Sequence, residues 1–157
     1  MATYAQALPA LTTSLFRPKW GSGVSNAVAF STASHPLEPA FPAWLQPTIK
    51  SFLDLLQLPQ NWDGYGASQM HEQIVQQALL LLVEVMDNDA PPPSVVPLSD
   101  GGVQVEWHRH GHNLEIEFPA AGEAPGFYYY EDNSATECEG QVSKSYDHLQ
   151  TYIASLK

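Results

Sequence analysis

The stretch VQVEWHRHGHNLEIEF, residues 103–118, decides the fold of this chain. Apolar and polar residues alternate on both sides of His110-Gly111, a pattern typical of half-buried β-strands. The pair His110-Gly111 suits a two-residue hairpin turn. Strands joined there would pair apolar residues with one another: Trp107 with Leu114, Val105 with Ile116, and Val103 with Phe118. We therefore predict an antiparallel hairpin with one wholly apolar face.

Further strands are predicted on both sides of this hairpin. Residues 95–98 form a short strand before it, and residues 127–130 form another after a loop. Residues 131–142 are polar and acidic, which indicates a loop or a short edge strand. The sequence thus predicts an antiparallel meander of about four strands.

Three helices flank the meander. The first begins near Ala43 and is stopped by Pro59. The second runs from about Ser68, a plausible N-cap, to about Asp87, and the last begins near Ser143. A meander with one apolar face needs a helical layer to cover it. We therefore expect an α+β two-layer sandwich with two N-terminal helices, the meander and a C-terminal helix.

The domain organisation follows from a change in composition. Residues 43–157 are predicted to form a single α+β domain. Residues 1–42 contain five prolines and show no sustained period, so we expect an N-terminal arm or a strap over the domain. Their aromatic content favours a strap, or an arm that docks on a partner.

Charge is unevenly distributed along the 157 residues, whose formal net charge is −11. Residues 1–53 carry three basic residues and one acid, a net +2, whereas residues 54–157 carry sixteen acids and three basic residues, a net −13. Non-specific nucleic-acid binding needs a cationic surface, so we expect no direct nucleic-acid partner.

Composition excludes several other classes of protein. The single cysteine, Cys138, excludes an internal disulfide framework and a multi-cysteine zinc site within one chain. The longest strongly apolar run, residues 78–83, is too short to cross a bilayer, so we expect no membrane partner. The first fifteen residues lack the basic and apolar regions of a signal peptide, which indicates a cytoplasmic protein.

The segment NWDGYGA, residues 61–67, links the first two predicted helices. It resembles a motif of small uncharacterised proteins of bacteria and their mobile elements, in which a leucine-rich helix precedes the motif. An alanine- and leucine-rich helix, a proline-containing strand and strands similar to residues 102–107 and 114–117 follow it. The resemblance covers about residues 50–130. It implies this fold and a prokaryotic or phage origin, and it implies no activity.

Two interpretations of this segment stay open. In one, Trp62, Asp63 and Tyr65 form a recognition patch. In the other, Trp62 and Tyr65 pack on the sheet, Asp63 caps the second helix or bonds to the turn, and the two glycines supply positive φ.

The histidines around the predicted turn are candidates for metal chemistry. Alternate residues of a strand share a face, so His108, His110 and His112 are considered as ligands, with Glu106 and Glu115 completing a carboxylate–imidazole site. The turn interrupts the alternation, and the spacing matches no established ligand signature. A solvated hairpin tip is the other interpretation. We expect no cofactor, and we keep a small metal-assisted hydrolase as an alternative.

Acidic and tyrosine residues gather on the predicted sheet and the loop that follows it. Such a surface resembles a protein-binding site more than a catalytic one. The candidate partner-binding residues are Glu106, Glu115, Glu117, Tyr128, Tyr130, Glu131, Asp132, Trp62 and Tyr65. The other interpretation is the solvent face of an acidic protein.

The chain lacks the patterns of common enzymes. It has no Gly-x-Ser-x-Gly elbow, phosphate-binding loop or dinucleotide-binding glycine turn, and acidic neighbours disfavour the thiolate of Cys138. We therefore expect a non-enzymatic module of a bacterium or its phage. It would bind and inhibit a basic protein, such as a toxin or a nucleic-acid-binding defence protein, in an antitoxin-like, immunity or anti-defence role. The remaining alternative is a homo-oligomeric structural component, such as a homodimer, whose subunits are held together by the arm.

Overall fold

The structure is a computed structural model that describes residues 41–120, 122–142 and 146–157. The described residues all belong to one compact unit. The predicted arm or strap lies outside them, except for Phe41 and Pro42, so its organisation stays a prediction.

Five antiparallel strands form one sheet in the order β1-β2-β3-β4-β5. They are β1 (Ser94–Pro97), β2 (Val103–Arg109), β3 (His112–Phe118), β4 (Gly126–Glu131) and β5 (Thr136–Gln141). The meander is confirmed, and of the two interpretations of residues 131–142 the structure shows the edge strand.

The hairpin register is confirmed pair by pair. Trp107 lies opposite Leu114, Val105 opposite Ile116 and Val103 opposite Phe118. His110 and Gly111 have φ values of 54° and 78°, as a two-residue turn between twisted strands requires.

Three helices accompany the sheet: α1 (Leu45–Leu56), α2 (Glu72–Val85) and α3 (Asp147–Ser155). Pro47 lies in the first turn of α1, where a missing N–H leaves no helical bond unmade. The predicted start at Ser143 lies outside the described residues. Among these residues, no helix combines the length and the apolar character that a membrane span requires.

The predicted start of the second helix is wrong. Its N-cap is His71 and not Ser68. The N–H of Ser68 donates to the carbonyl of Ser99 at 2.8 Å, and the N–H of His71 donates to the carbonyl of Gly101 at 3.1 Å. This segment is therefore held against the turn between β1 and β2 before the helix begins.

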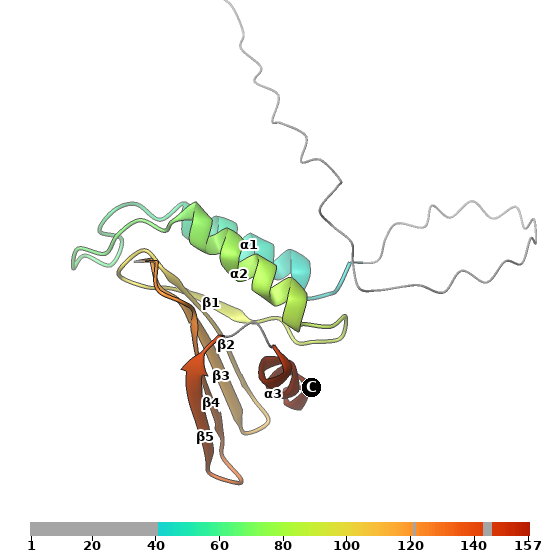
Figure 1. The fold of residues 1–157 in the computed structure, drawn as a ribbon. Helices are drawn as coiled ribbons and strands as arrows, with labels where there is room; N and C mark the ends of the chain where they lie inside the picture. The colour runs from blue at the N-terminus through green and yellow to red at the C-terminus, as the bar shows by residue number, and fades with distance from the viewer. Residues whose placement is uncertain (1–40, 121, 143–145) are drawn as a thin grey trace, which may run out of the picture. The chain divides into compact units, whose positions relative to one another are not determined.

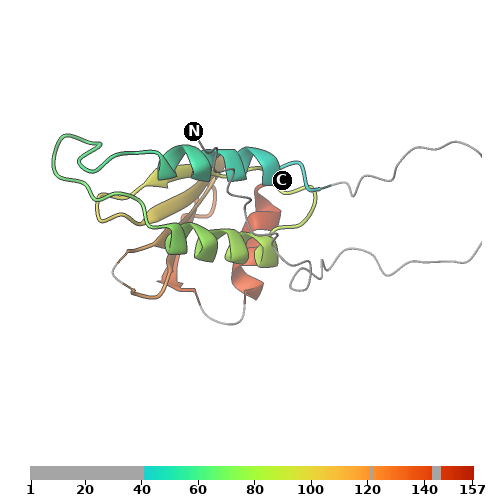
Figure 2. The ribbon, with the colours of Figure 1, turned by 90° about the horizontal axis from the view of Figure 1, so that it is seen from above.

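The helices lie on one face of the sheet, with α1 beside β1, α2 next to α1 and against β2 and β3, and α3 beside β3 (Figures 1 and 2). The apolar side chains of β2 and β3 form the core beneath them, each at most 2% exposed. Two tryptophan side chains of this core donate hydrogen bonds to the backbone of the connector between α2 and β1. Trp44 Nε1 donates to the carbonyl of Asp87, and Trp107 Nε1 donates to the carbonyl of Pro91, both at 2.9 Å.

Candidate functional site

The sheet face opposite the helices, here called the outer face, carries the candidate site. The strand registers identify the side chains on this face, because alternate residues of a strand share a face. On β2 to β5 they are Gln104, Glu106, His108, Asn113, Glu115, Glu117, Tyr128, Tyr130, Glu137, Glu139 and Gln141. Of the residues on these four strands, the outer face therefore holds five carboxylates and two tyrosines, and no Lys or Arg.

Five of the predicted partner-binding residues are brought together there: Glu106, Glu115, Glu117, Tyr128 and Tyr130. The strand registers align Glu106, Glu115, Tyr128 and Glu139 in one row across four strands. Desolvation, followed by the nearby carboxylate of Glu137, raises the pKa of Tyr128. The phenol therefore stays neutral between acidic neighbours and offers an aromatic surface with a hydroxyl group.

A neighbouring row contains His108, Asn113, Tyr130 and Glu137. His108 Nδ1 lies 2.7 Å from Asn113 Oδ1, and its Nε2 lies 3.7 Å from Glu106 Oε2. Because an amide oxygen only accepts, Nδ1 carries the proton in this bond. The bond to Asn113 is the main cause that raises the pKa of His108, against partial desolvation, and Glu106 and Glu115 add to it.

A metal ion could be held on this face by Glu106, His108 and Glu115. One donor atom from each lies within 4.8 Å of the others. The bond from Nδ1 to Asn113 leaves Nε2 as the nitrogen available to a metal, an orientation typical of histidine ligands. Gln104 Nε2 donates to Glu106 Oε2 at 2.8 Å and fixes that carboxylate.

The structure does not bring the three histidines together. The two-residue turn pairs His112 with Arg109, which places His112 on the face opposite His108. There His112 Nδ1 lies 2.7 Å from the hydroxyl of Tyr129, and the two rings stack with centroids 6.0 Å apart. His110 lies in the turn itself.

The outer face is hollowed around Gly126, which has no side chain. This hollow, here called the Gly126 hollow, has a volume of about 400 Å³. Three carboxylates and one tyrosine are among the groups that line it: Glu115, Glu117, Glu139 and Tyr128. Its size and charge suit the end of a Lys or Arg side chain, whose stem can lie along the tyrosine ring.

Two other predicted partner-binding residues, Glu131 and Asp132, are not among the outer-face residues. Glu131 accepts a hydrogen bond from Ser134 Oγ at 2.8 Å, within the β4–β5 hairpin. Asp132 is in the turn, where its N–H donates to the carbonyl of Gly111 at 2.8 Å.

The loop that carries Trp62 and Tyr65 is built by turn chemistry. Asp63 Oδ1 accepts from the N–H groups of Tyr65 and Ala67 at 2.8 and 3.1 Å, and these bonds lower the pKa of Asp63. Gly64 and Gly66 have φ values of 77° and 100°. These parts of the second interpretation are confirmed.

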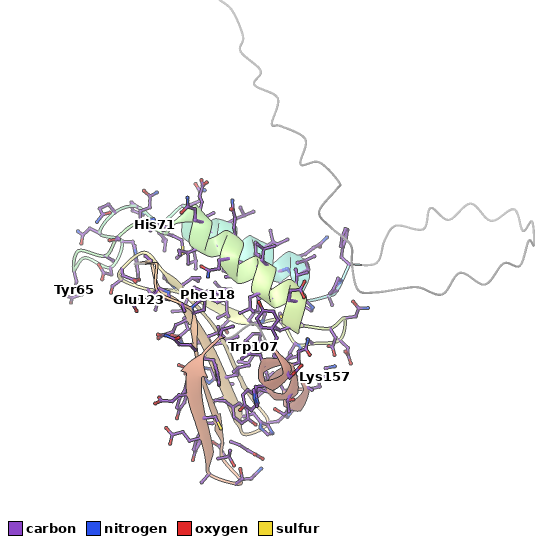
Figure 3. The ribbon with its side chains drawn as sticks, in the orientation of Figure 1. Tyr65, His71, Trp107, Phe118, Glu123 and Lys157 are labelled. Atoms are coloured by element: carbon purple, nitrogen blue, oxygen red, sulfur yellow. The ribbon has the colours of Figure 1, made fainter. Side chains whose placement is uncertain are left out.

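The predicted packing of Tyr65 on the sheet is wrong. Its side chain lies at the tip of the loop (Figure 3) and is 95% exposed. The side chain of Trp62 is half-buried. The segment that follows this loop, residues 68–71, is attached to the β1–β2 turn by backbone hydrogen bonds. The first interpretation of the segment, a recognition patch, stays a prediction.

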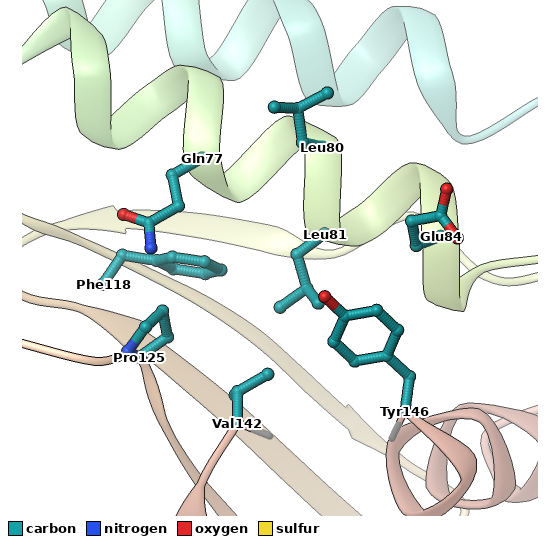
Figure 4. Close-up of a pocket in the computed structure, with 8 residues that line it drawn as sticks. All are labelled: Gln77, Leu80, Leu81, Glu84, Phe118, Pro125, Val142 and Tyr146. Carbon is teal, nitrogen blue, oxygen red and sulfur yellow. The ribbon is translucent and has the colours of Figure 1, made fainter. Parts of the chain in front are cut away.

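An apolar pocket that the sequence did not reveal lies on the helical side of the sheet (Figure 4). It has a volume of about 290 Å³, and most of its lining is apolar. The lining residues are Gln77, Leu80, Leu81 and Glu84 of α2, together with Phe118, Pro125, Val142 and Tyr146. Residues 143–145, between two of its lining residues, lie outside the description. No periodicity signals such a pocket, because its walls come from segments far apart in the chain.

Comparison of the chain with models of protein families, with curated proteins and with solved structures gives no significant match.

Proposed function

We propose that this protein is a non-enzymatic interaction module whose outer face binds a basic protein and inhibits it. The observation that carries the proposal is the outer face, on which five carboxylates and two tyrosines lie. Within residues 41–120, 122–142 and 146–157, no helix covers this face (Figure 1) and no Lys or Arg lies on its strands. Such an arrangement concentrates negative potential over one surface and steers a cationic partner towards it.

Like charges on neighbouring strands support the proposal. Glu106 lies directly opposite Glu115, a pairing that destabilises an antiparallel sheet unless a cation lies nearby. A Lys or Arg of a partner would relieve this repulsion. The tyrosines add the large, rigid contact surface that interfaces favour.

Inhibition would follow from competition. A toxin or defence protein that acts on nucleic acid presents a cationic groove, and the outer face would cover that groove in place of the phosphate backbone. The resemblance of residues 61–67 to mobile-element proteins supports a bacterial or phage setting and an anti-defence, immunity or antitoxin-like role. A cytoplasmic location is part of the same proposal.

The test compares two double variants with the same change in net charge. Glu115→Lys/Glu117→Lys alters the outer face, and Glu72→Lys/Glu123→Lys alters exposed positions elsewhere. Binding of each full chain to a lysine homopolymer is measured by calorimetry across a salt series. We expect the outer-face variant to bind at least about tenfold more weakly than the control and with a flatter salt dependence. Equal weakening in the two variants would show that net charge, and not this face, attracts the cation.

A second candidate function is metal-assisted hydrolysis, which the convergence of Glu106, His108 and Glu115 favours. Two carboxylates and one imidazole leave coordination positions open for a water molecule. Elemental analysis of untagged protein, and melting with and without added zinc or manganese, test it. A stoichiometric metal that is lost in His108→Ala supports this candidate, whereas a metal-free protein with an unchanged melting temperature rejects it.

A further inference from the structure

β5 is the last strand of the sheet, and within the described residues no strand lies beyond it. Edge strands usually carry proline, lysine or a bulge that prevents another strand from pairing with them. The sequence of β5, TECEGQ, contains neither proline nor lysine, and all six of its residues pair regularly with β4.

The hydrogen-bond phase of the ladder shows which backbone groups face outward. The N–H of Val142 donates to the carbonyl of Pro125 at 2.7 Å, which fixes that pair as a hydrogen-bonded one. Such pairs alternate in an antiparallel ladder, so Gly140 and Cys138 also bond to β4. The N–H and carbonyl groups of Glu137, Glu139 and Gln141 therefore point away from the sheet.

A bond at the other end of β4 gives the same phase independently. The N–H of Asp132 donates to the carbonyl of Gly111 at 2.8 Å. The alternation then assigns Tyr128 and Tyr130 to bonds with β3, which leaves Phe127 and Tyr129 to bond with β5.

The outward backbone groups and the acidic side chains belong to the same residues. Glu137 and Glu139 place their carboxylates on the outer face, in the rows of Tyr130 and Tyr128. A strand added beside β5 would have its own hydrogen-bonded residues opposite them, with side chains on that same face. Basic residues at those positions would meet both glutamates, and the Gly126 hollow lies one strand further in.

A second copy of the chain is a poor occupant of this edge. Two β5 strands paired antiparallel would set glutamates against glutamates, and like charges directly opposite destabilise a sheet. The carboxylates therefore protect the edge from self-pairing and leave it open to a strand of opposite charge.

We propose that the basic partner adds an extended segment to β5 as a sixth strand, with Lys or Arg at alternate positions facing Glu137 and Glu139. This inference rests on the proposed function and specifies how that partner is recognised. The intervening residues of the segment would lie beside Cys138, on the side of the sheet that carries α3. There a hydrogen bond with Cys138, followed by desolvation, raises the pKa of Tyr152, so the phenol stays neutral and presents no charge to the added strand. Uncharged residues such as Thr or Val suit those positions.

The test uses two labelled peptides of about nine residues in which lysine and threonine alternate. One is unmodified, and in the other each lysine carries a methyl group on its backbone nitrogen. The methyl groups remove the donors that would face β5 and keep every charge. Binding to the full chain is measured by fluorescence anisotropy. We expect the methylated peptide to bind at least about tenfold more weakly.

Two further measurements locate the contact. Amide exchange of Glu137 and Glu139 should slow when the unmodified peptide binds, whereas the amide of Cys138, already bonded to β4, should not change. Gln141→Pro removes an outward N–H at the end of β5 without changing the charge, and Gln141→Ala retains it. We expect the proline variant to bind the peptide more weakly than the alanine variant.

The outcomes separate this inference from the proposed function. Equal affinity for the two peptides, or no binding of either, would overturn strand addition. If Glu115→Lys/Glu117→Lys still weakens binding of the lysine homopolymer, the acidic-face function survives that result. A dimer in sedimentation whose Glu137 and Glu139 amides are protected without peptide would also overturn the inference, because β5 would then pair with a second copy.

Discussion

The indole of Trp107 is hydrogen-bonded to the backbone of Pro91, sixteen residues earlier in the chain. Its Nε1 donates to the Pro91 carbonyl at 2.9 Å, and this bond is buried. The proline connector that follows α2 is thereby fixed to the centre of β2.

We predict that Trp107→Phe destabilises the protein more than Trp44→Phe, although both remove the same indole N–H. The Pro91 carbonyl would be left buried without a partner, at a cost of about 1–3 kcal/mol beyond the lost packing. The bond from Trp44 to Asp87 is only partly buried, so water can replace it. Urea unfolding followed by circular dichroism measures both variants, and a larger loss for Trp44→Phe would contradict the prediction.

Gly102 should not accept a side chain. A Cβ there would clash with the carbonyl oxygen of Phe118 and lie 2.9 Å from Asp100 Oδ1. We predict that Gly102→Ala lowers the free energy of unfolding by about 1–3 kcal/mol. The control is Gly126→Ala, where the nearest atom lies 3.7 Å away and a change within about 0.5 kcal/mol is expected. Similar losses for the two variants would show that the close approach at Gly102 can relax.

Asp63 should make stability depend on pH. Hydrogen bonds from the backbone of Tyr65, then of Ala67, lower its pKa in the folded state. A lowered folded pKa stabilises the protein above the unfolded pKa, and this stabilisation is lost as pH falls through the folded value. We expect Asp63→Ala to melt at a lower temperature than the wild type near neutral pH. The difference should shrink below about pH 4, and a constant difference across a pH series would contradict this role.

His108 should show the opposite pH dependence. The hydrogen bond to Asn113 is the main cause that raises its pKa in the folded state. A raised folded pKa stabilises the protein at pH values below the unfolded pKa, and the contribution is lost as pH rises through the folded value. We predict that Asn113→Ala lowers the pKa of His108, measured by NMR titration of its ring protons. The melting difference from the wild type should be larger near about pH 5.5 than near about pH 8. An unchanged pKa would assign the shift to Glu106 and Glu115 instead.

The sequence predicted the hairpin in full because two local signals agree. The period of two assigns Val105 and Ile116 to one face, and the two-residue turn at His110-Gly111 fixes the register. The grouping of Glu106, Glu115 and Glu117 on one face followed from the same register. A shift of one residue would have buried these carboxylates.

Long-range contacts account for what the sequence missed. Ser68 is a good N-cap residue, but the N–H groups of Ser68 and His71 bond to the carbonyls of Ser99 and Gly101. These long-range bonds hold the segment against the β1–β2 turn with an extended backbone at His71, and the helix starts at Glu72. Tyr65 has the character of a core residue, but two glycines in positive φ place it at the tip of a loop. The local sequence pattern does not show which distant residues will form such hydrogen bonds or where a loop will place a side chain.

The amino-acid sequence alone determined the α+β class, the meander, the register of its β2–β3 hairpin and the uneven charge, because periodicity and turn chemistry act between near neighbours. Only the tertiary structure decided that β5 pairs with β4 and that, among the described strands, none pairs with the other edge of β5 at Glu137 and Glu139. It also decided that His108 meets two glutamates while His112 meets Tyr129 on the opposite face. These relationships depend on which strand and which helix cover each face, and that is set by burial of the whole core.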